Sequence, residues 1–363
     1  MSTDIPFVTL QFDPDDITVG DKKDLREGLS AIALHGQDLW LACDEGCRLE
    51  RLSRAGSGPT FSSHRSFPLA EILDLPAARV EGKPEEEADV EGMDIDDGWL
   101  WFVGSHSVKR KNPKADDSRP QISDKLLKVS RDGNRHLLAR IPLDGGLPRR
   151  AAGSRRAACI DSSLKSSALL EAIEASEDPH LLPFVTLPGK DNGLDIEGLA
   201  VRGMRAFIGL RGPVLRGWSC ILELHLEAQD DKLKLLPLDG AVSYRKHFQN
   251  LNNLGLRDLL IHGDDLFVLA GPTQSHDGPH EIWRSKGGAK EAGAGPSDFQ
   301  QVLVLPQREK VDRAEGFTVL EGSGASTSVL VVYDTPAEGR LVKKGAVTAD
   351  VFRLGEVSRQ SAA

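Results

Sequence analysis

Hydrophobic and polar positions follow a repeated two-part pattern along the chain. Each unit opens with a charged residue, usually followed by Gly, and continues with alternating apolar positions. A polar turn and a second, more apolar run come next. The opening runs are Glu27–Ala31, Glu91–Ile95, Glu197–Val201, Arg257–Ile261 and Glu315–Val319. The second runs are Leu39–Cys43, Leu100–Gly104, Ala206–Leu210, Leu266–Ala270 and Val329–Tyr333. Alternating runs joined by turns that contain Asp and Gly predict β-hairpins.

Three of the four intervals between opening runs are close to 60 residues (64, 60 and 58), and the remaining one is 106. Further strands are predicted at Lys125–Val129, His136–Ala139, Ile221–His225 and Gln301–Leu305. One unit is therefore about four antiparallel strands. Because such units form a β-propeller when they stack radially, we predict an all-β, five-bladed β-propeller.

The two ends of the chain are expected to close this ring. Phe7–Phe12 is a strand without a unit of its own, and the last unit is one strand short after Ala349–Arg353. A strand from residues 7–12 would complete the last blade and cover an open sheet edge. We expect one domain over residues 1–363. Its blades are expected at residues 27–76, 91–143, 197–238, 257–306 and 315–354.

The long interval is expected to hold a helical insertion at residues 144–190, after the second blade. Leu164, Leu169, Leu170 and Ile173 have near-helical spacing within residues 161–177. The alternative is a sixth blade, for which the interval supplies only Phe184–Leu187 as a strand.

Aligning the repeats predicts two rings of polar residues at one mouth of the central channel. The opening runs would contribute Glu27, Glu91, Glu197, Arg257 and Glu315. The ends of the second runs would contribute Asp44, Ser105, Arg211, Gly271 and Asp334, with His106 beside Ser105. Together they carry six carboxylates and two guanidinium groups, and such like charges repel unless they are paired or bound to a metal.

Three arrangements would relieve this repulsion. Arg211 and Arg257 would pair with carboxylates in a structural network, or the carboxylates would remain solvated in a wide funnel. In the third arrangement a divalent cation such as Ca²⁺ would collect oxygen ligands. The candidate metal ligands are Glu27, Glu91, Glu197, Glu315, Asp44 and Asp334. The candidate ligand-binding residues are Arg211, Glu197, Glu91, Glu27, Glu315, Arg257, His106 and Ser105.

Composition narrows the class of partner. The formal net charge is −10, yet residues 109–156 hold 14 Lys and Arg against five Asp and Glu. This basic stretch has no aromatic residue on which bases could stack, so nucleic acid is not an expected partner. No apolar run approaches the roughly 18 residues of a membrane span, and the four cysteines are scattered. We expect a cytoplasmic monomer with no membrane partner.

Asn192–Ala200, followed by Gly209–Pro213, resembles a bacterial family known only as a domain of unknown function. Glu91-Gly92 with Val103–Ser107, and Leu269–Pro272, are similar to motifs of the same family. The resemblance spans roughly residues 20–335.

The Glu-Gly-apolar repeat is also similar to propellers of the phytase-like esterase group, several of which hold calcium with acidic residues. That similarity implies a metal-dependent phosphoesterase or esterase. The fourth repeat has Arg257-Asp258 in place of Glu-Gly, so the ring of acidic residues is not complete in this sequence.

Two functions follow from these observations. The first is binding of a small anionic ligand or a protein partner at the mouth. The alternative is hydrolysis of a small anionic ester, in which a cation and Arg211 hold the anion while Glu197 positions water. The sequence has no nucleophile elbow, P-loop, HExxH or dinucleotide motif, so it assigns no catalytic residue.

Overall fold

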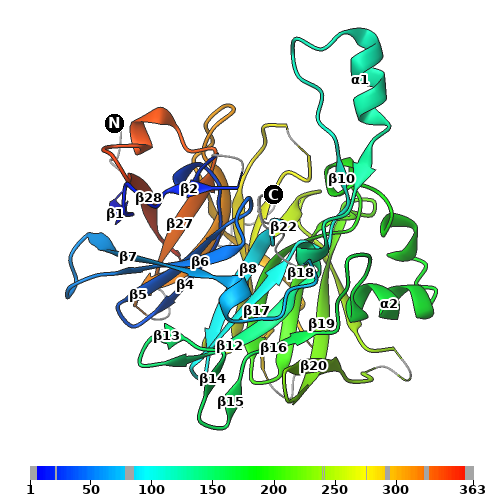
Figure 1. Cartoon of the computed structure of the whole chain (residues 1–363), viewed down its shortest axis with the longest axis horizontal. Helices are drawn as coiled ribbons and strands as arrows, with labels where there is room; N and C mark the ends of the chain where they lie inside the picture. Colours follow the sequence, from blue (N-terminus) through cyan, green and yellow to red (C-terminus); the bar gives the residue numbers. More distant parts are fainter. Residues whose placement is uncertain are drawn as a thin grey trace, which may run out of the picture.

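The computed structural model describes residues 6–20, 23–77, 86–238, 240, 242–274, 276–290, 295–322 and 327–355. Strands dominate these residues, and the helices α1 (Arg119–Leu126) and α2 (Ala168–Ala175) have only eight residues each. The fold is all-β, as predicted (Figure 1). No helix in the described part of the chain is long and apolar enough to cross a membrane.

The strands form antiparallel groups of four that follow one another along the chain. The first group is β4 (Leu29–His35), β5 (Asp38–Cys43), β6 (Arg48–Ser53) and β7 (Thr60–Pro68). The second is β8 (Val90–Asp96), β9 (Trp99–Gly104), β12 (Leu138–Asp144) and β16 (Ala158–Ile160). The third is β17 (Asp195–Arg202), β18 (Arg205–Gly212), β19 (Trp218–Gln229) and β21 (Arg245–Asn250), and β20 (Lys232–Leu235) also pairs with β19. The fourth is β22 (Gly255–His262), β23 (Asp265–Gly271), β24 (Glu281–Ser285) and β25 (Gln300–Val304).

The fifth group contains both ends of the described chain. It consists of β26 (Arg313–Glu321), β27 (Ser328–Asp334), β28 (Ala346–Arg353) and β1 (Phe7–Gln11). β1 lies antiparallel to β28, from Phe7 opposite Asp350 to Gln11 opposite Ala346. The prediction that the N-terminal strand completes the last group is therefore confirmed. β1 also pairs in parallel with β7, so it joins the fifth group to the first.

The first strands of the groups pack side by side in a closed order, β4, β8, β17, β22 and β26, and β26 then packs against β4. The Glu-Gly repeat has a packing cause here, because a Cβ at Gly92 in β8 would lie 2.5 Å from the backbone nitrogen of Leu199 in β17. Polar side chains also join neighbouring first strands. Asp94 Oδ2 accepts from the Val201 N–H at 2.7 Å, and Asp258 Oδ2 accepts from the Phe317 N–H at 3.0 Å.

Apolar cores fill the spaces between neighbouring groups. Trp40 of β5 and Phe102 of β9 belong to one buried cluster, and Phe267 of β23 and Phe317 of β26 belong to another. Burying apolar surface gives roughly 25 cal/mol per Å², so these contacts between groups hold the ring together.

Two predicted strands are wrong. Lys125 and Leu126 end α1, which starts where the Ser118 N–H donates to Gln121 Oε1 at 2.8 Å, with Pro120 in the first turn. Such capping favours a helix over the strand that the apolar pattern of Lys125–Val129 indicated. Phe184 ends a short 3-10 helix (Leu182–Phe184) where Phe184–Leu187 was predicted as a strand.

Residues 144–190 contain more than helix. The short strands β13 (Leu147–Pro148), β14 (Ala151–Ala152) and β15 (Arg155–Arg156) precede β16, and α2 follows with Leu169, Leu170 and Ile173 buried. Ser167 begins α2 by accepting a hydrogen bond from the Leu170 N–H at 3.3 Å.

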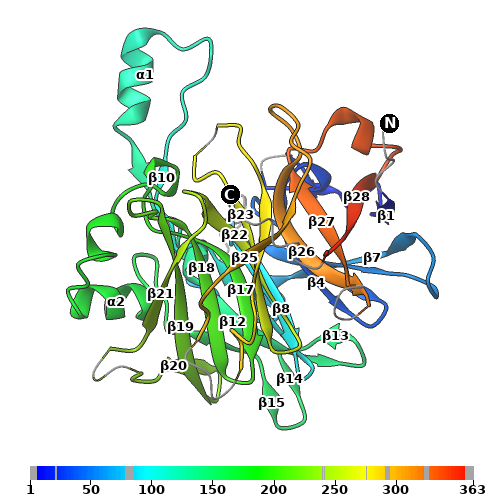
Figure 2. The same ribbon diagram turned by 180° about the vertical axis from the view of Figure 1, so that it is seen from behind.

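A narrow arm leaves the body of the protein in the second group. Its base is β10 (Lys109–Arg110) paired with β11 (Val129–Ser130), and α1 lies at its far end (Figures 1 and 2). Arg110 Nε donates to Asp191 Oδ2 at 2.6 Å, which ties the base of the arm to the body.

Candidate functional site

A β-bulge interrupts every first strand at the same place in its pairing with the second strand. The register shifts fall between Leu29 and Ala31, Val90 and Gly92, Ile196 and Leu199, Leu256 and Asp258, and Ala314 and Gly316. The residues left out of the ladder include Ser30, Glu91, Glu197, Arg257 and Glu315, which we call the bulge ring. Bulges re-aim side chains out of the sheet. All five bulge-ring residues line one cavity of about 670 Å³.

The second predicted ring stands at the ends of the second strands. Asp44, Arg211 and Asp334 line the same cavity as the bulge ring. Gly271 and Ser105 do not line it, although their neighbours Pro272 and Ser107 do.

Glu27 lies elsewhere. It is exposed at the end of a 3-10 turn (Leu25–Glu27) and lines a smaller cavity of about 370 Å³, which it shares with Asp44 and Asp334. Ser30 takes the bulge position of the first group and donates from Oγ to the Val90 carbonyl at 2.6 Å. The Glu27-Gly28 pair imitates the repeat, but the 3-10 turn delays the start of the strand.

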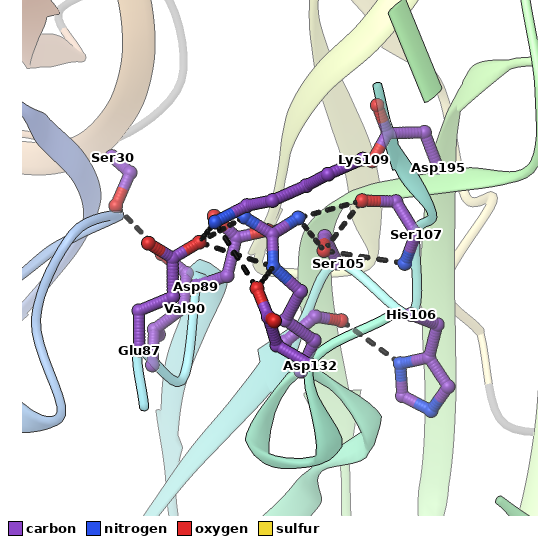
Figure 3. Close-up of polar contacts among 12 residues, drawn as sticks. Ser30, Glu87, Asp89, Val90, Ser105, His106, Ser107, Lys109, Asp132 and Asp195 are labelled. Carbon is purple, nitrogen blue, oxygen red and sulfur yellow. Dashed lines mark hydrogen bonds and ion pairs between the residues drawn. The ribbon is translucent and has the colours of Figure 1, made fainter. Parts of the chain in front are cut away.

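His106 is buried and points away from the polar residues near it (Figure 3). Its Nδ1 bonds to the Gly104 carbonyl at 2.9 Å, and its ring centroid lies 5.9 Å from that of His136. Burial lowers the pKa of His106 to about 3, so the imidazole is neutral at pH 7. It does not line the cavity.

Two arginines share three carboxylates along one side of the cavity. Arg211 pairs with Asp195 and, at 2.5 Å, with Glu197. Arg257 pairs with Glu197 at 3.0 Å and with Glu315. All five side chains are nearly or fully withdrawn from solvent. The result is a continuous ionic chain from β17 through β18 and β22 to β26.

Burial and ion pairing have opposite effects on the pKa values of the residues in this ionic network. Burial raises the pKa of Glu197 to about 7, although Arg211 and Arg257 oppose that rise. The neighbouring carboxylates raise the pKa of Arg211, which stays charged. The structural network expected for Arg211 and Arg257 is thus present, with Asp195 as a member that the repeat alignment missed because it precedes the bulge by two residues.

Arg135 forms a second ionic group at the edge of the cavity. Its guanidinium pairs with Glu87, with Asp89 at 2.7 Å, and with Ser107 Oγ at 2.9 Å. Ser105 also accepts from Arg135, and Figure 3 shows Ser105, Ser107, Glu87, Asp89 and Asp132 gathered around this group. Sequence reasoning missed Arg135 because it lies outside the aligned repeats, in the basic stretch of residues 109–156.

Three other carboxyl groups that line this cavity have no cationic partner among the described residues. Asp44, Glu91 and Asp334, here called the acid wall, form no ion pair with any described residue. The Asp44 carboxyl group accepts only a long hydrogen bond from Cys43 Sγ, at 3.7 Å. The Asp334 carboxyl group accepts a hydrogen bond from the Thr335 hydroxyl at 3.1 Å.

The acid wall is electrostatically strained as a consequence. Burial, together with Asp89 and Asp334, raises the pKa of Asp44 to about 7. Burial, together with Asp89 and Glu197, raises the pKa of Glu91 well above its ordinary value. A protonated Glu91 can both donate and accept a hydrogen bond, whereas a carboxylate only accepts.

The predicted calcium ligands are not gathered into one coordination sphere. Across the part of the chain that the structure describes, no group of three or more His, Cys, Asp or Glu side chains is placed to hold a metal. Glu197 and Glu315 instead face guanidinium groups. Ca²⁺ takes six to eight oxygen ligands, so these residues do not fit it.

The fold and site define an all-β protein with a charge-dense central cavity. A family model described as protein of unknown function (DUF3616) matches residues 28–350. The chain belongs to that family, which confirms the expected resemblance to a domain of unknown function. A search of curated proteins finds no match.

Solved structures with a similar fold include a luciferin-regenerating enzyme, with 10% identity and a TM-score of 0.38 over 91% of this chain and 78% of that one. The PQQ-bound aldose sugar dehydrogenase of Streptomyces coelicolor is 11% identical, with a TM-score of 0.36 over 96% and 99% of the two chains. A streptogramin B lyase is 10% identical, with a TM-score of 0.32 over 96% and 98%. At such identities the likeness does not extend to activity.

Proposed function

We propose that the protein binds a small polar ligand in the central cavity and that the acid wall receives the ligand's hydrogen-bond donors or cationic group. The observation that carries the proposal is the contrast between the paired arginines and the unpaired carboxyl groups that line the cavity. Arg135, Arg211 and Arg257 each already pair with at least two carboxylates, whereas Asp44, Glu91 and Asp334 form no ion pair with any described residue. Buried carboxyl groups without a partner are costly to ionise unless a ligand donates hydrogen bonds or supplies a positive charge to them.

The architecture proposed for this site is a five-bladed β-propeller. The closed order of β4, β8, β17, β22 and β26 supports it, as does the bulge at one register position in each first strand. The proposed blades are the four antiparallel strands of each group, and α2 with the turns around it is an insertion between the second and third blades.

The ligand proposed here differs from the small anionic ligand that the sequence predicted at Arg211 and Arg257. An oxyanion at those arginines would have to displace a bidentate or shared carboxylate partner, and such charge-assisted bonds are strong. A hydroxyl or ammonium group at the acid wall displaces no protein partner.

The test is a binding screen by calorimetry at pH 8 with neutral polyols, primary amines and amino acids on the intact chain. Compounds with donors should bind, and Asp44→Asn and Asp334→Asn should each weaken binding of an amine about tenfold or more. Glu171→Gln, an exposed carboxylate on α2, is the matched control and should leave affinity unchanged. Equal affinity in the wild type and both acid-wall variants would overturn the proposal.

A further inference from the structure

The second-ring position of the fourth group has no side chain of its own. Gly271 stands where the other groups carry Asp44, Ser105, Arg211 or Asp334, at the end of β23. A Cβ at Gly271 would lie 2.7 Å from Cδ2 of His280 and 3.1 Å from Cγ of Arg257. The imidazole of His280, which comes from the loop before β24, therefore fills the space that a second-ring side chain would take.

His280 is placed to meet a ligand. It lines the cavity, and among the described residues its ring nitrogens have no hydrogen-bond partner. Two arginines from neighbouring strands, Arg257 of β22 and Arg313 of β26, line the same cavity as His280. Burial and these two charges lower the pKa of His280 to about 3, so the imidazole is neutral at pH 7.

The carboxylates nearest to His280 in sequence are engaged with other groups. Asp277 Oδ1 accepts from the backbone N–H of Lys310 at 3.0 Å, and Glu281 Oε2 accepts from Trp283 Nε1 at 3.1 Å. Asp277 and His276 line the same cavity as His280.

Arg313 is the unusual arginine of this cavity. It opens β26 directly opposite Asp334 in the register, yet its guanidinium forms no ion pair with any described carboxylate. The other arginines that line the cavity are paired, including the exposed Arg308 with Asp312 at 2.7 Å. The guanidinium of Arg313 is therefore the one in this cavity that remains available to a ligand among the described residues.

We propose that Arg313 and His280 form an oxyanion subsite in this cavity, next to the Asp334 end of the acid wall. The ligand would then carry a carboxylate or phosphate group at this subsite, with its hydrogen-bond donors or cation directed to Asp44 and Glu91 of the first and second groups. This inference rests on the proposed function, because it assigns the second end of the same ligand. A free guanidinium fork is a strong donor that binds an oxyanion in two places, and a neutral imidazole adds one further N–H donor.

The experiment uses acetate and inorganic phosphate as separate probes, with affinity measured by calorimetry and the His280 ring signals followed by NMR. One or both anions should bind, move the His280 signals and raise the pKa of His280, because the anion stabilises the imidazolium. The stronger of the two probes identifies the class of oxyanion.

Arg313→Gln should weaken binding of that anion at least tenfold, and Arg313→Lys should restore only part of the loss. Arg308→Gln is the matched control, since Arg308 lines the same cavity but is already paired. His280→Gln should also weaken binding while thermal unfolding stays close to that of the wild type.

Unchanged affinity in Arg313→Gln, an equal loss in Arg308→Gln, or His280 signals that do not respond to either anion would overturn the subsite. Asp44→Asn separates this result from the proposed function. If that change leaves amine binding intact while Arg313→Gln abolishes anion binding, the acid wall fails and the oxyanion subsite stands. The reverse outcome retains the acid wall alone.

Discussion

Arg257 and Glu315 stand at equivalent bulges of adjacent first strands and form an ion pair across the boundary between the fourth and fifth groups. Because Arg257 also pairs with Glu197 of the third group, one side chain bridges three groups. Both partners are more than nine-tenths withdrawn from solvent. The pairing therefore determines how the groups meet as well as the charge of the cavity.

Removing that bridge should be costly. Arg257→Ala leaves Glu197 and Glu315 with a lost partner, and breaking a buried pair by deleting one member typically costs about 3 to 5 kcal/mol of unfolding free energy. Urea unfolding of the variant measures the loss. Arg202→Ala is the control, because Arg202 pairs with an exposed Asp264 and should cost less than about 1 kcal/mol. Equal losses in the two variants would contradict the role given to Arg257.

Arg211 should not tolerate a change to lysine. Its guanidinium meets Asp195 and Glu197 through two different nitrogens, and a lysine ammonium cannot reproduce that fork. Arg211→Lys should therefore lose most of the unfolding free energy that Arg211→Ala loses, on the order of 2 kcal/mol or more. Thermal melts of both variants check this, and a wild-type melting temperature in Arg211→Lys would refute it.

The acid wall should make stability depend on pH in a defined direction. The folded-state pKa of Asp44 is about 7, against an ordinary value of about 3.8 for an aspartic acid, so the folded protein binds the extra proton between these pH values. The contribution of Asp44 to the free energy of unfolding must then fall as pH rises from about 4 to about 7. Asp44→Asn removes this penalty and should stabilise the protein at pH 8 by about 1 to 2 kcal/mol, with little effect at pH 4.

Chemical denaturation at the two pH values provides the measurement. Asp15→Asn is the matched control, because the Asp15 side chain is 92% exposed. A stabilisation by Asp44→Asn that is the same at both pH values would contradict the assigned charge state. A loss of stability at pH 8 would do so as well.

The contribution of β1, the strand that closes the fifth group, can be tested by substituting one buried and one exposed residue of this strand. Leu10 of β1 is fully buried in the cluster that also holds Leu330 of β27, whereas Phe7 is 56% exposed. Leu10→Ala should cost about 2 to 5 kcal/mol of unfolding free energy, and Phe7→Ala about 0.5 kcal/mol or less. Equilibrium unfolding in urea distinguishes them, and similar costs would show that β1 adds little to the ring.

Much of the fold was predictable because each unit of the sequence repeats an opening run that starts at a charged residue and a second, more apolar run after a turn. The same pattern located Glu91, Glu197, Arg257 and Glu315 in one cavity. The alignment failed at Glu27 because a 3-10 turn carries an identical Glu-Gly pair three residues before the true bulge at Ser30. Local sequence does not reveal which of two such positions leaves the ladder.

The remaining site residues come from outside the repeat. Arg135 enters from a 3-10 turn before β12, and His280 enters from the loop before β24. Their contribution depends on close approach to other groups, such as the space left by Gly271. Period and charge cannot indicate such contacts, because they arise only when segments far apart in the chain are packed.

The position of β1 between β28 and β7 has a consequence for biosynthesis. Residues 7–11 pair with residues 346–350, more than 300 positions further along the chain. The fifth group therefore cannot be completed until residues 346–350 have been synthesised. Contacts so distant in sequence slow folding, so the closure of the fifth group is expected to be a late step of folding.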